Sequence, residues 1–238
     1  MPRRDGRKAQ ELRPFTLKKN FTKHADGSVL VSAGETQVVC TAMCEPGVPS
    51  FLKGSGSGWV TAEYGMLPGS CPSRIRRNTA SGRVKEIQRL IGRSLRAVTD
   101  TALLGENTVK IDCDVLQADG GTRTASITGA FVALALACRN MQRRGLIARM
   151  PLTDSIAAVS VGISGKAVLL DLNYEEDSTA DVDMNVVMVG KGRLVEVQGT
   201  AEGRTFSRAD LDRMLTSAGR GIRQLIAIQQ KALKGIAL

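Results

Sequence analysis

Length, composition and charge set the first limits on this protein. The chain has 238 residues, of which 42% are hydrophobic and 24% are charged, so it is long enough for one large domain or two small ones. Lysine and arginine number 33 against 23 acidic residues, which gives a formal net charge of +10. This excess favours a polyanionic partner, with nucleic acid ahead of a membrane surface, although solubility alone also accounts for it.

Cysteine and histidine usage exclude several kinds of site. The five cysteines are odd in number and none has the CxxC spacing of a zinc site, so we expect free thiols and a cytoplasmic protein. His24 is the only histidine, which excludes His-based triads and multi-His metal sites. We find no signal peptide and expect no apolar run long enough to span a bilayer, hence no membrane partner.

The N-terminal third predicts a basic arm followed by strands. Residues 1–13 carry five basic side chains, and we expect an arm that is disordered or lies on a partner, or simply a solvated tail. Residues 15–42 are rich in β-forming residues around two turns, at 25–28 and 33–35, and predict strands. After a loop over 45–58, residues 59–64 predict another strand.

A second loop and a helix follow. Residues 69–81 hold Arg74, Arg76 and Arg77 without intervening acid, which suggests contacts to nucleic-acid phosphates; a solvated loop is equally open. Residues 82–99 predict a helix with an apolar face and a basic stripe. Ser81 is its expected N-cap, so Arg83 falls in the first turn, where its charge opposes the helix dipole.

Residues 109–137 are the most informative stretch. Apolar and polar residues alternate over 109–115, then Asp-Gly-Gly forms a turn at 119–121, and a small, apolar segment starts at Thr122. This predicts a strand, a tight turn and a buried helix, an arrangement whose free amide groups and dipole suit an anion. Arg123 stands in the first helical turn, and Thr122, Thr124 and Ser126 add hydroxyl groups. A glycine turn capping an ordinary core helix is the alternative.

The C-terminal part combines strands, an acidic cluster and a helix. Residues 156–161 and 166–172 predict a hairpin, and 185–188 and 193–199 predict two more strands. The segment between residues 172 and 185 holds Asp177, Asp181 and Asp183. Repulsion between such carboxylates should raise the pKa of one of them, or a divalent cation should bind to them, unless the segment is merely a solvated acidic loop.

The last segment and a faint repeat suggest the fold class. Residues 207–236 predict a long helix or a broken pair, with Gly219 and Gly221 as points where it can kink. Residues 60–65 resemble residues 199–203, and each stretch precedes a loop and an amphipathic helix. We therefore expect one α+β domain over residues 1–238, built from two pseudo-symmetric βα halves with mixed sheets and packed helices.

Several long segments resemble the ribonuclease PH family of phosphate-dependent exoribonucleases, related to polynucleotide phosphorylase and the exosome ring subunits. The segments that carry the resemblance are GSVLV from Gly27, WVTAEYGMLP from Trp59, SGRVKEIQRLIGRSLRAV from Ser81, DCDVLQADGGTRTASITGA from Asp112, EDSTADVDMNVVM from Glu176 and VEVQGTAEG from Val195. The resemblance covers nearly the whole chain. It implies the ribonuclease PH fold, of the ribosomal protein S5 domain 2-like type, and a homo-hexamer built as a trimer of dimers.

The resemblance also implies roles for individual residues. Those expected to bind inorganic phosphate are Arg83, Gly121, Thr122, Arg123 and Ser126. Asp177 and Asp183 are implied as the catalytic carboxylates, acting as a general acid or holding Mg²⁺, while Asp181 is only their neighbour. Arg74, Arg76 and Arg77 are expected to contact RNA.

The implied reaction is phosphorolysis of an RNA 3′ end, in which inorganic phosphate as co-substrate releases a nucleoside diphosphate. The family's usual substrate is the 3′ trailer of precursor tRNA. Two alternatives stay open: a non-catalytic ring subunit that only binds RNA, and a phosphate-binding enzyme with no RNA role. The joint presence of Arg83, Arg123, Asp177 and Asp183 favours the active enzyme over the first. The basic arm and the arginine-rich loop argue against the second.

Overall fold

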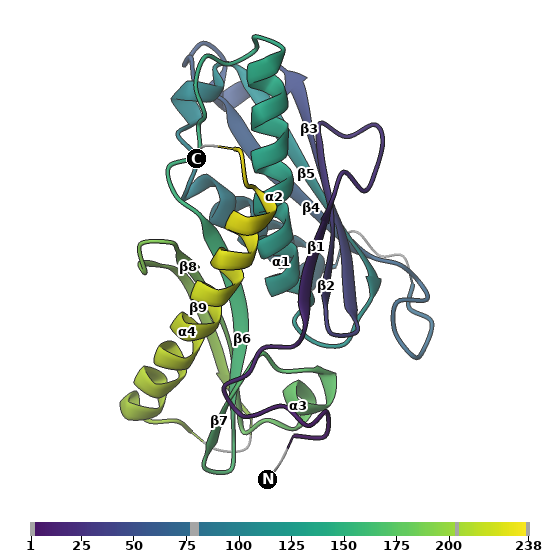
Figure 1. The fold of residues 1–238 in the computed structure, drawn as a ribbon, viewed down its shortest axis with the longest axis vertical. Helices are drawn as coiled ribbons and strands as arrows, with labels where there is room; N and C mark the ends of the chain where they lie inside the picture. Colours follow the sequence, from purple (N-terminus) through teal and green to yellow (C-terminus); the bar gives the residue numbers. More distant parts are fainter. Residues whose placement is uncertain (1–2, 77–80, 203–204, 237–238) are drawn as a thin grey trace.

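Two sheets and four α-helices make up the fold (Figure 1). The computed structural model describes residues 3–76, 81–202 and 205–236. The first sheet has the order β1-β2-β3-β5-β4, and its strands are β1 Phe15–Lys19, β2 Gly27–Ala33, β3 Thr36–Pro46, β4 Trp59–Met66 and β5 Asn107–Gln117. All pairs in it are antiparallel except β4 with β5, because helix α1, Gly82–Arg96, makes the crossover between those two strands.

The second sheet is antiparallel throughout and has the order β7-β6-β8-β9. Its strands are β6 Ile156–Ser164, β7 Ala167–Leu170, β8 Val182–Val189 and β9 Leu194–Ala201. A short helix, α3 Tyr174–Thr179, joins β7 to β8, and α4, Arg208–Ala232, follows β9. The α+β class is therefore confirmed. The two segments of the faint repeat, in β4 and β9, are both edge strands that lead to a helix.

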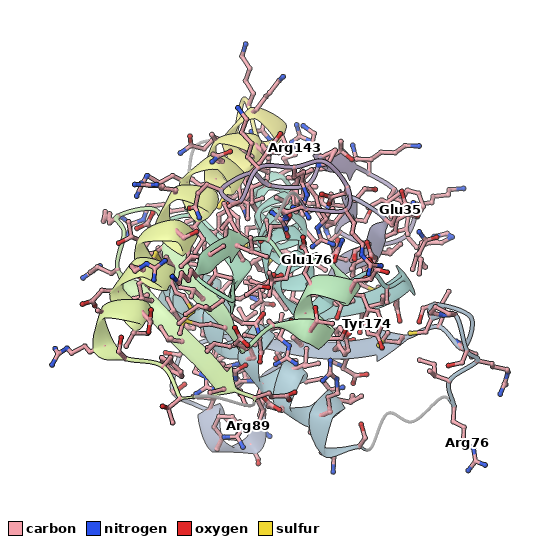
Figure 2. The ribbon with its side chains drawn as sticks, turned by 90° about the horizontal axis from the view of Figure 1, so that it is seen from below. Glu35, Arg76, Arg89, Arg143, Tyr174 and Glu176 are labelled. Carbon is pink, nitrogen blue, oxygen red and sulfur yellow. The ribbon has the colours of Figure 1, made fainter. Side chains whose placement is uncertain are left out.

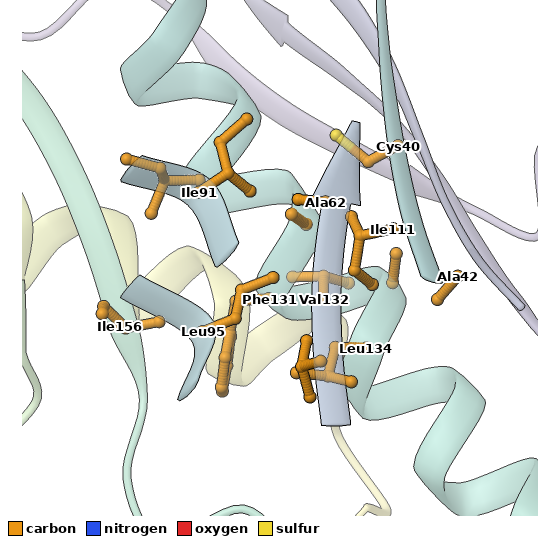
Figure 3. Close-up of a cluster of buried hydrophobic side chains, with 14 of the residues drawn as sticks. Cys40, Ala42, Ala62, Ile91, Leu95, Ile111, Phe131, Val132, Leu134 and Ile156 are labelled. Carbon is orange, nitrogen blue, oxygen red and sulfur yellow. The ribbon is translucent and has the colours of Figure 1, made fainter. Parts of the chain in front are cut away.

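Helix α2, Thr122–Arg143, lies between the two sheets and organises the core. It packs on β2 and β3 of the first sheet and on β6 of the second (Figure 1). Phe131 and Leu134 on this helix are fully buried and lie with Ile91 and Leu95 from α1 in the main apolar cluster (Figure 3). Ile127, also on α2 and fully buried, belongs to the same cluster. Each such side chain contributes about 1.5–3 kcal/mol through removal from water, so α2 holds its N-terminal turn on a rigid support.

The same helix corrects one expectation. By length and hydropathy α2 could cross a membrane, contrary to our expectation that no segment is long and apolar enough. In the fold, 83% of its apolar window is buried inside the protein. This window is apolar because both sheets and α1 pack against the helix.

The N-terminal arm is also not as predicted. In the described part of it, Arg3, Arg7 and Arg13 are buried against the protein's own second half rather than free or on a partner. They form ion pairs with Glu176 and Asp171. Composition suggested a solvated arm because arginine is seldom buried unless it is paired. The acids that pair with Arg3 and Arg13 lie more than 150 residues away in sequence, so the arm itself gives no sign of them.

Candidate active site

The predicted anion turn forms at the start of α2. Gly121 is the N-cap and has φ 63°, and Gly120 has φ 72°, a left-handed region that glycine enters without strain. The Thr36 hydroxyl, fully buried in β3, donates to the Gly120 carbonyl at 2.7 Å and accepts from the Asp119 amide at 2.9 Å. The turn is thereby fixed, and the first amide groups of α2 face outward without intrahelical partners.

Arg123 extends from this first turn toward two other elements. Its guanidinium donates to the Gln198 side chain of β9 at 3.2 Å and lies 3.9 Å from the Glu86 carboxylate of α1. Gln198 donates in turn to Glu86 at 3.2 Å. Groups from both halves of the fold therefore hold the Arg123 side chain in one position.

Arg83 stands in the first turn of α1, where Ser81 caps the helix by accepting a hydrogen bond from the Val84 amide at 3.3 Å. Neither α1 nor α2 has an acidic residue in its first turn. Both helix starts thus combine a positive dipole end with an arginine, which concentrates positive potential between them.

Two carboxylates face these arginines. Asp177 lies on α3, which begins with a capping box formed by Asn173 and Glu176. Asp183 lies on β8, where it alternates with buried Val182 and Met184 and so points out of the core. The sequence did not predict α3, whose six residues are too few for a clear helical periodicity.

A cavity of about 970 Å³ brings these groups together. Six of the seven predicted phosphate and carboxylate residues line it, namely Arg83, Gly121, Thr122, Arg123, Asp177 and Asp183. Ser126 does not line it: its side chain is fully buried and its hydroxyl donates to the Thr122 carbonyl at 2.8 Å. Asp181 is also outside the lining, and its carboxylate accepts from the Gly165 amide at 2.8 Å.

The cavity perturbs both carboxylates in the same direction. Partial burial raises the pKa of Asp177, and the neighbouring charge of Asp183 raises it further, while Arg123 and Arg83 oppose the shift. The pKa of Asp183 is likewise raised, first by partial burial and then by Glu202, against an opposing effect of Arg123. A carboxyl with a raised pKa holds a proton more tightly and is suited to donate it as a general acid.

Tyr64, on β4, is a site residue that the sequence analysis missed. Its hydroxyl lies 2.9 Å from the Thr122 hydroxyl at the mouth of the turn. Burial raises the pKa of Tyr64, so the phenol stays protonated at neutral pH and can orient the Thr122 side chain. The sequence predicts only a strand over residues 59–64, and a strand pattern does not show which distant residue the ring of Tyr64 contacts.

The arginine-rich loop borders the same cavity. Cys71, Pro72, Ser73 and Ile75 line one wall, while Arg74 and Arg76 are exposed. Figure 2 shows Arg76 at the outer end of this loop, pointing away from the body of the protein. Arg77 lies outside the described residues.

The candidate ligands for a metal ion in the cavity are few in the described part of the chain. Among the described residues, no group of three or more His, Cys, Asp or Glu side chains is arranged as a metal site. Mg²⁺ often uses only one or two carboxylates and keeps several waters. Asp177 and Asp183, with Asn185 on the same wall of the cavity, are the right donors for that type of site.

Comparison with known proteins gives a consistent family. Models of the 3′ exoribonuclease family match residues 11–140 as its domain 1 and residues 154–221 as its domain 2. Ribonuclease PH of Moorella thermoacetica is 56% identical over 241 residues, covering 100% of this chain and 96% of that protein. Ribonuclease PH of Bacillus subtilis is 56% identical over 236 residues, covering 97% and 96%.

Among solved structures, the exosome of Archaeoglobus fulgidus with RNA bound to its active site is similar to this chain, with a TM-score of 0.82 and 25% identity. The match covers 94% of this chain and 91% of that one. The match of both family domains, the identity along the full length and the two-sheet fold agree, and the chain belongs to the 3′ exoribonuclease family of ribonuclease PH.

Proposed function

We propose that this protein shortens RNA from its 3′ end by phosphorolysis, with inorganic phosphate as co-substrate. The observation that carries the proposal is the single cavity lined by two arginine-bearing helix starts and two carboxylates with raised pKa. A subunit that only binds RNA has no need for such an arrangement. The substrates we propose are precursor tRNA 3′ ends, as the family resemblance implies.

In the proposed reaction, phosphate binds at the Gly121–Thr122 turn between Arg83 and Arg123. A phosphate oxygen attacks the terminal phosphodiester, a new P–O bond forms, and the bond to the preceding nucleotide's 3′ oxygen breaks. The departing 3′ oxygen takes a proton from Asp177 or Asp183, and a nucleoside diphosphate leaves. Catalysis rests on positioning and on neutralisation of the crowded oxygens by the arginines.

A divalent cation is the alternative to this proton transfer, because carboxylates that hold a metal ion are ionised and do not donate a proton. Asp177 and Asp183 would hold Mg²⁺, which when bound supplies positive charge for the phosphate oxygens. Ser126 supports the turn through the Thr122 carbonyl, so we assign phosphate contact to the other four members of the predicted phosphate set. We further propose a homo-hexameric ring and a cytoplasmic location, the latter supported by five free thiols.

The test is product identification with and without phosphate. Incubation with a 3′-tailed tRNA precursor should release nucleoside diphosphates only when phosphate is present. Arg123→Ala should lower kcat/KM for phosphate by about 10²–10³, as expected for loss of a group that stabilises transition-state charge. Nucleoside monophosphates released without phosphate would mean hydrolysis and would overturn the proposal.

A further inference from the structure

The buried arginines of the N-terminal arm take no part in the scheme above. Arg13 is 5% exposed and its acidic partner, Asp171, is 6% exposed. Taking such a pair out of water is costly, and it is retained only with good geometry and further hydrogen bonds. Asp171 also has φ 56°, a strained conformation for a residue with a side chain. The other contacts of Arg13 and Asp171 show which parts of the fold this pair connects.

On one side, Arg13 holds the segment that leads into α3. Its main-chain amide donates to the Asp171 carboxylate at 2.8 Å, and its guanidinium donates to both carboxylate oxygens at 3.1 and 2.7 Å. Burial acts to lower the pKa of Arg13, but Asp171 outweighs it and the pKa is raised. Arg3 and Arg7 donate to the Asp171 carbonyl at 2.8 and 3.0 Å. Asp171 precedes Asn173, the N-cap of α3, by two residues.

On the other side, the same guanidinium holds the turn at residues 119–121, before α2, which is the phosphate turn of the proposed reaction. Arg13 donates to the Asp119 carbonyl at 2.5 Å and to the Gly120 carbonyl at 3.4 Å. A Cβ at Gly121 would lie 2.9 Å from the Arg13 guanidinium. One planar side chain therefore bridges the α2 turn and the segment before α3, which belong to different halves of the fold.

A second link joins these two segments directly. The Asp119 carboxylate accepts from the Tyr174 amide, the first of α3, at 3.2 Å. A Cβ at Gly120 would lie 2.6 Å from the Asn173 carbonyl carbon and 2.8 Å from the Leu172 carbonyl oxygen. The turn and the start of α3 are thus in backbone contact, and the distance from bound phosphate to Asp177 depends on this junction.

We propose that Arg13 and Asp119 are positioning residues, which set the phosphate turn of α2 in register with the carboxylate of α3. This rests on the proposed phosphorolysis and extends it. In-line attack requires the attacking phosphate and the proton donor of the leaving 3′ oxygen to be held at fixed positions on opposite sides of the reacting phosphorus. A displacement of about 1 Å can cost about a hundredfold in rate. Lysine cannot replace Arg13 because a single ammonium cannot reproduce the bridging fork.

The experiment measures steady-state phosphorolysis of one RNA at varied phosphate concentration for wild type and Arg13→Lys. We expect kcat/KM for phosphate to fall about ten- to hundredfold, while the KM for RNA stays within twofold. Arg7→Lys is the matched control, because Arg7 is buried in the same acidic cluster but does not contact the turn. It should lower the melting temperature and leave the phosphate KM unchanged.

A merely structural role predicts the same melting shift for both variants and no change in phosphate kinetics, which would overturn the proposal. If Arg13→Lys does not fold, Asp119→Ala decides the question, since it leaves no buried charge unpaired. Loss of a negative charge beside the anion should by itself tighten phosphate binding, whereas loss of register weakens it. A raised phosphate KM supports the proposal, and an unchanged or lowered one overturns it. Failure of the wild type to use phosphate would instead reject the proposed function.

Discussion

At the scale of single residues, acids that are neighbours in sequence have different properties because they lie in different environments. Asp177 and Asp183 line the cavity and have raised pKa values, whereas Asp181, between them in sequence, accepts a hydrogen bond from Gly165 outside it. A raised carboxyl pKa means that the folded state disfavours the ionised form. Keeping these carboxylates in the cavity therefore lowers stability at neutral pH in exchange for a usable proton.

Asp183→Asn tests this at the residue scale. Because the folded pKa of Asp183 lies above the unfolded one, the folded state binds more protons between these two pKa values. Stability therefore falls as pH rises through that range, and the penalty remains at higher pH. We expect Asp183→Asn to abolish most activity and to raise the melting temperature at pH 7. The gain should shrink as pH falls toward about 4, the ordinary range of Asp.

Thermal unfolding at several pH values measures the effect. Asp181→Asn is the control, since its amide oxygen can still accept from Gly165 and its side chain does not line the cavity. A melting temperature of Asp183→Asn below that of wild type at pH 7 would contradict the prediction.

At the scale of elements, the two glycines of helix α4 do not interrupt the helix, although the sequence allowed it. The sequence allowed a kink or a broken pair at Gly219 and Gly221, but α4 is a single helix, Arg208–Ala232. Gly221 faces the second sheet, where a Cβ would lie 2.8 Å from Leu170 Cδ1 and 3.3 Å from Leu12 Cδ2. It is glycine because β7 and the N-terminal arm pack against it.

The two glycines of α4 make a matched pair of variants. At Gly219 the nearest atom to a new Cβ is at 3.6 Å, so Gly219→Ala should stabilise the protein by about 0.5–1 kcal/mol through helix propensity. Gly221→Ala gains the same propensity but overpacks the core, and should destabilise by about 1–3 kcal/mol. Denaturant unfolding of both variants measures this, and equal effects would show that propensity alone governs the positions.

At the scale of the whole molecule, positive charge is divided between internal structure and surface. The chain has a formal net charge of +10, yet Arg3, Arg7 and Arg13 are buried in ion pairs and cannot meet a polyanion. Arg74 and Arg76 are exposed, and Figure 2 shows Arg76 at the outer end of its loop. Because other residues of their loop line the cavity, we propose that this loop guides an RNA strand toward the carboxylates.

Removal of these two arginines tests that role. Arg74→Ala with Arg76→Ala should weaken RNA binding and reduce the salt slope by about 0.7 for each lost phosphate contact to a single strand. The phosphate KM should not change, because neither side chain lines the cavity. Arg143→Ala is the control, since this residue ends α2 about 30 Å from the turn. An unchanged slope in the double variant would place the RNA elsewhere.

Much of the site could be predicted because its parts are local in sequence. The strand, glycine turn and helix around Gly121 follow from residues a few positions apart, and Arg83 follows from its place after Ser81. The same locality predicts the α+β class and a strand over 185–188, although β8 begins at Val182 and so includes Asp183. Family resemblance then selected Asp177 and Asp183 from the acidic cluster, which periodicity alone could not do.

Other features depend on contacts between distant segments. Tyr64 meets Thr122 across 58 positions, and Arg13 meets Asp171 across 158. No local pattern encodes such partners, because they are chosen by the way α2 packs between two sheets. The sequence by itself determined which charged groups are available and which arginines stand in the first turn of a helix. Only the tertiary structure decided which arginines are buried and which face the cavity, since a charge can leave water only where the fold supplies its partner.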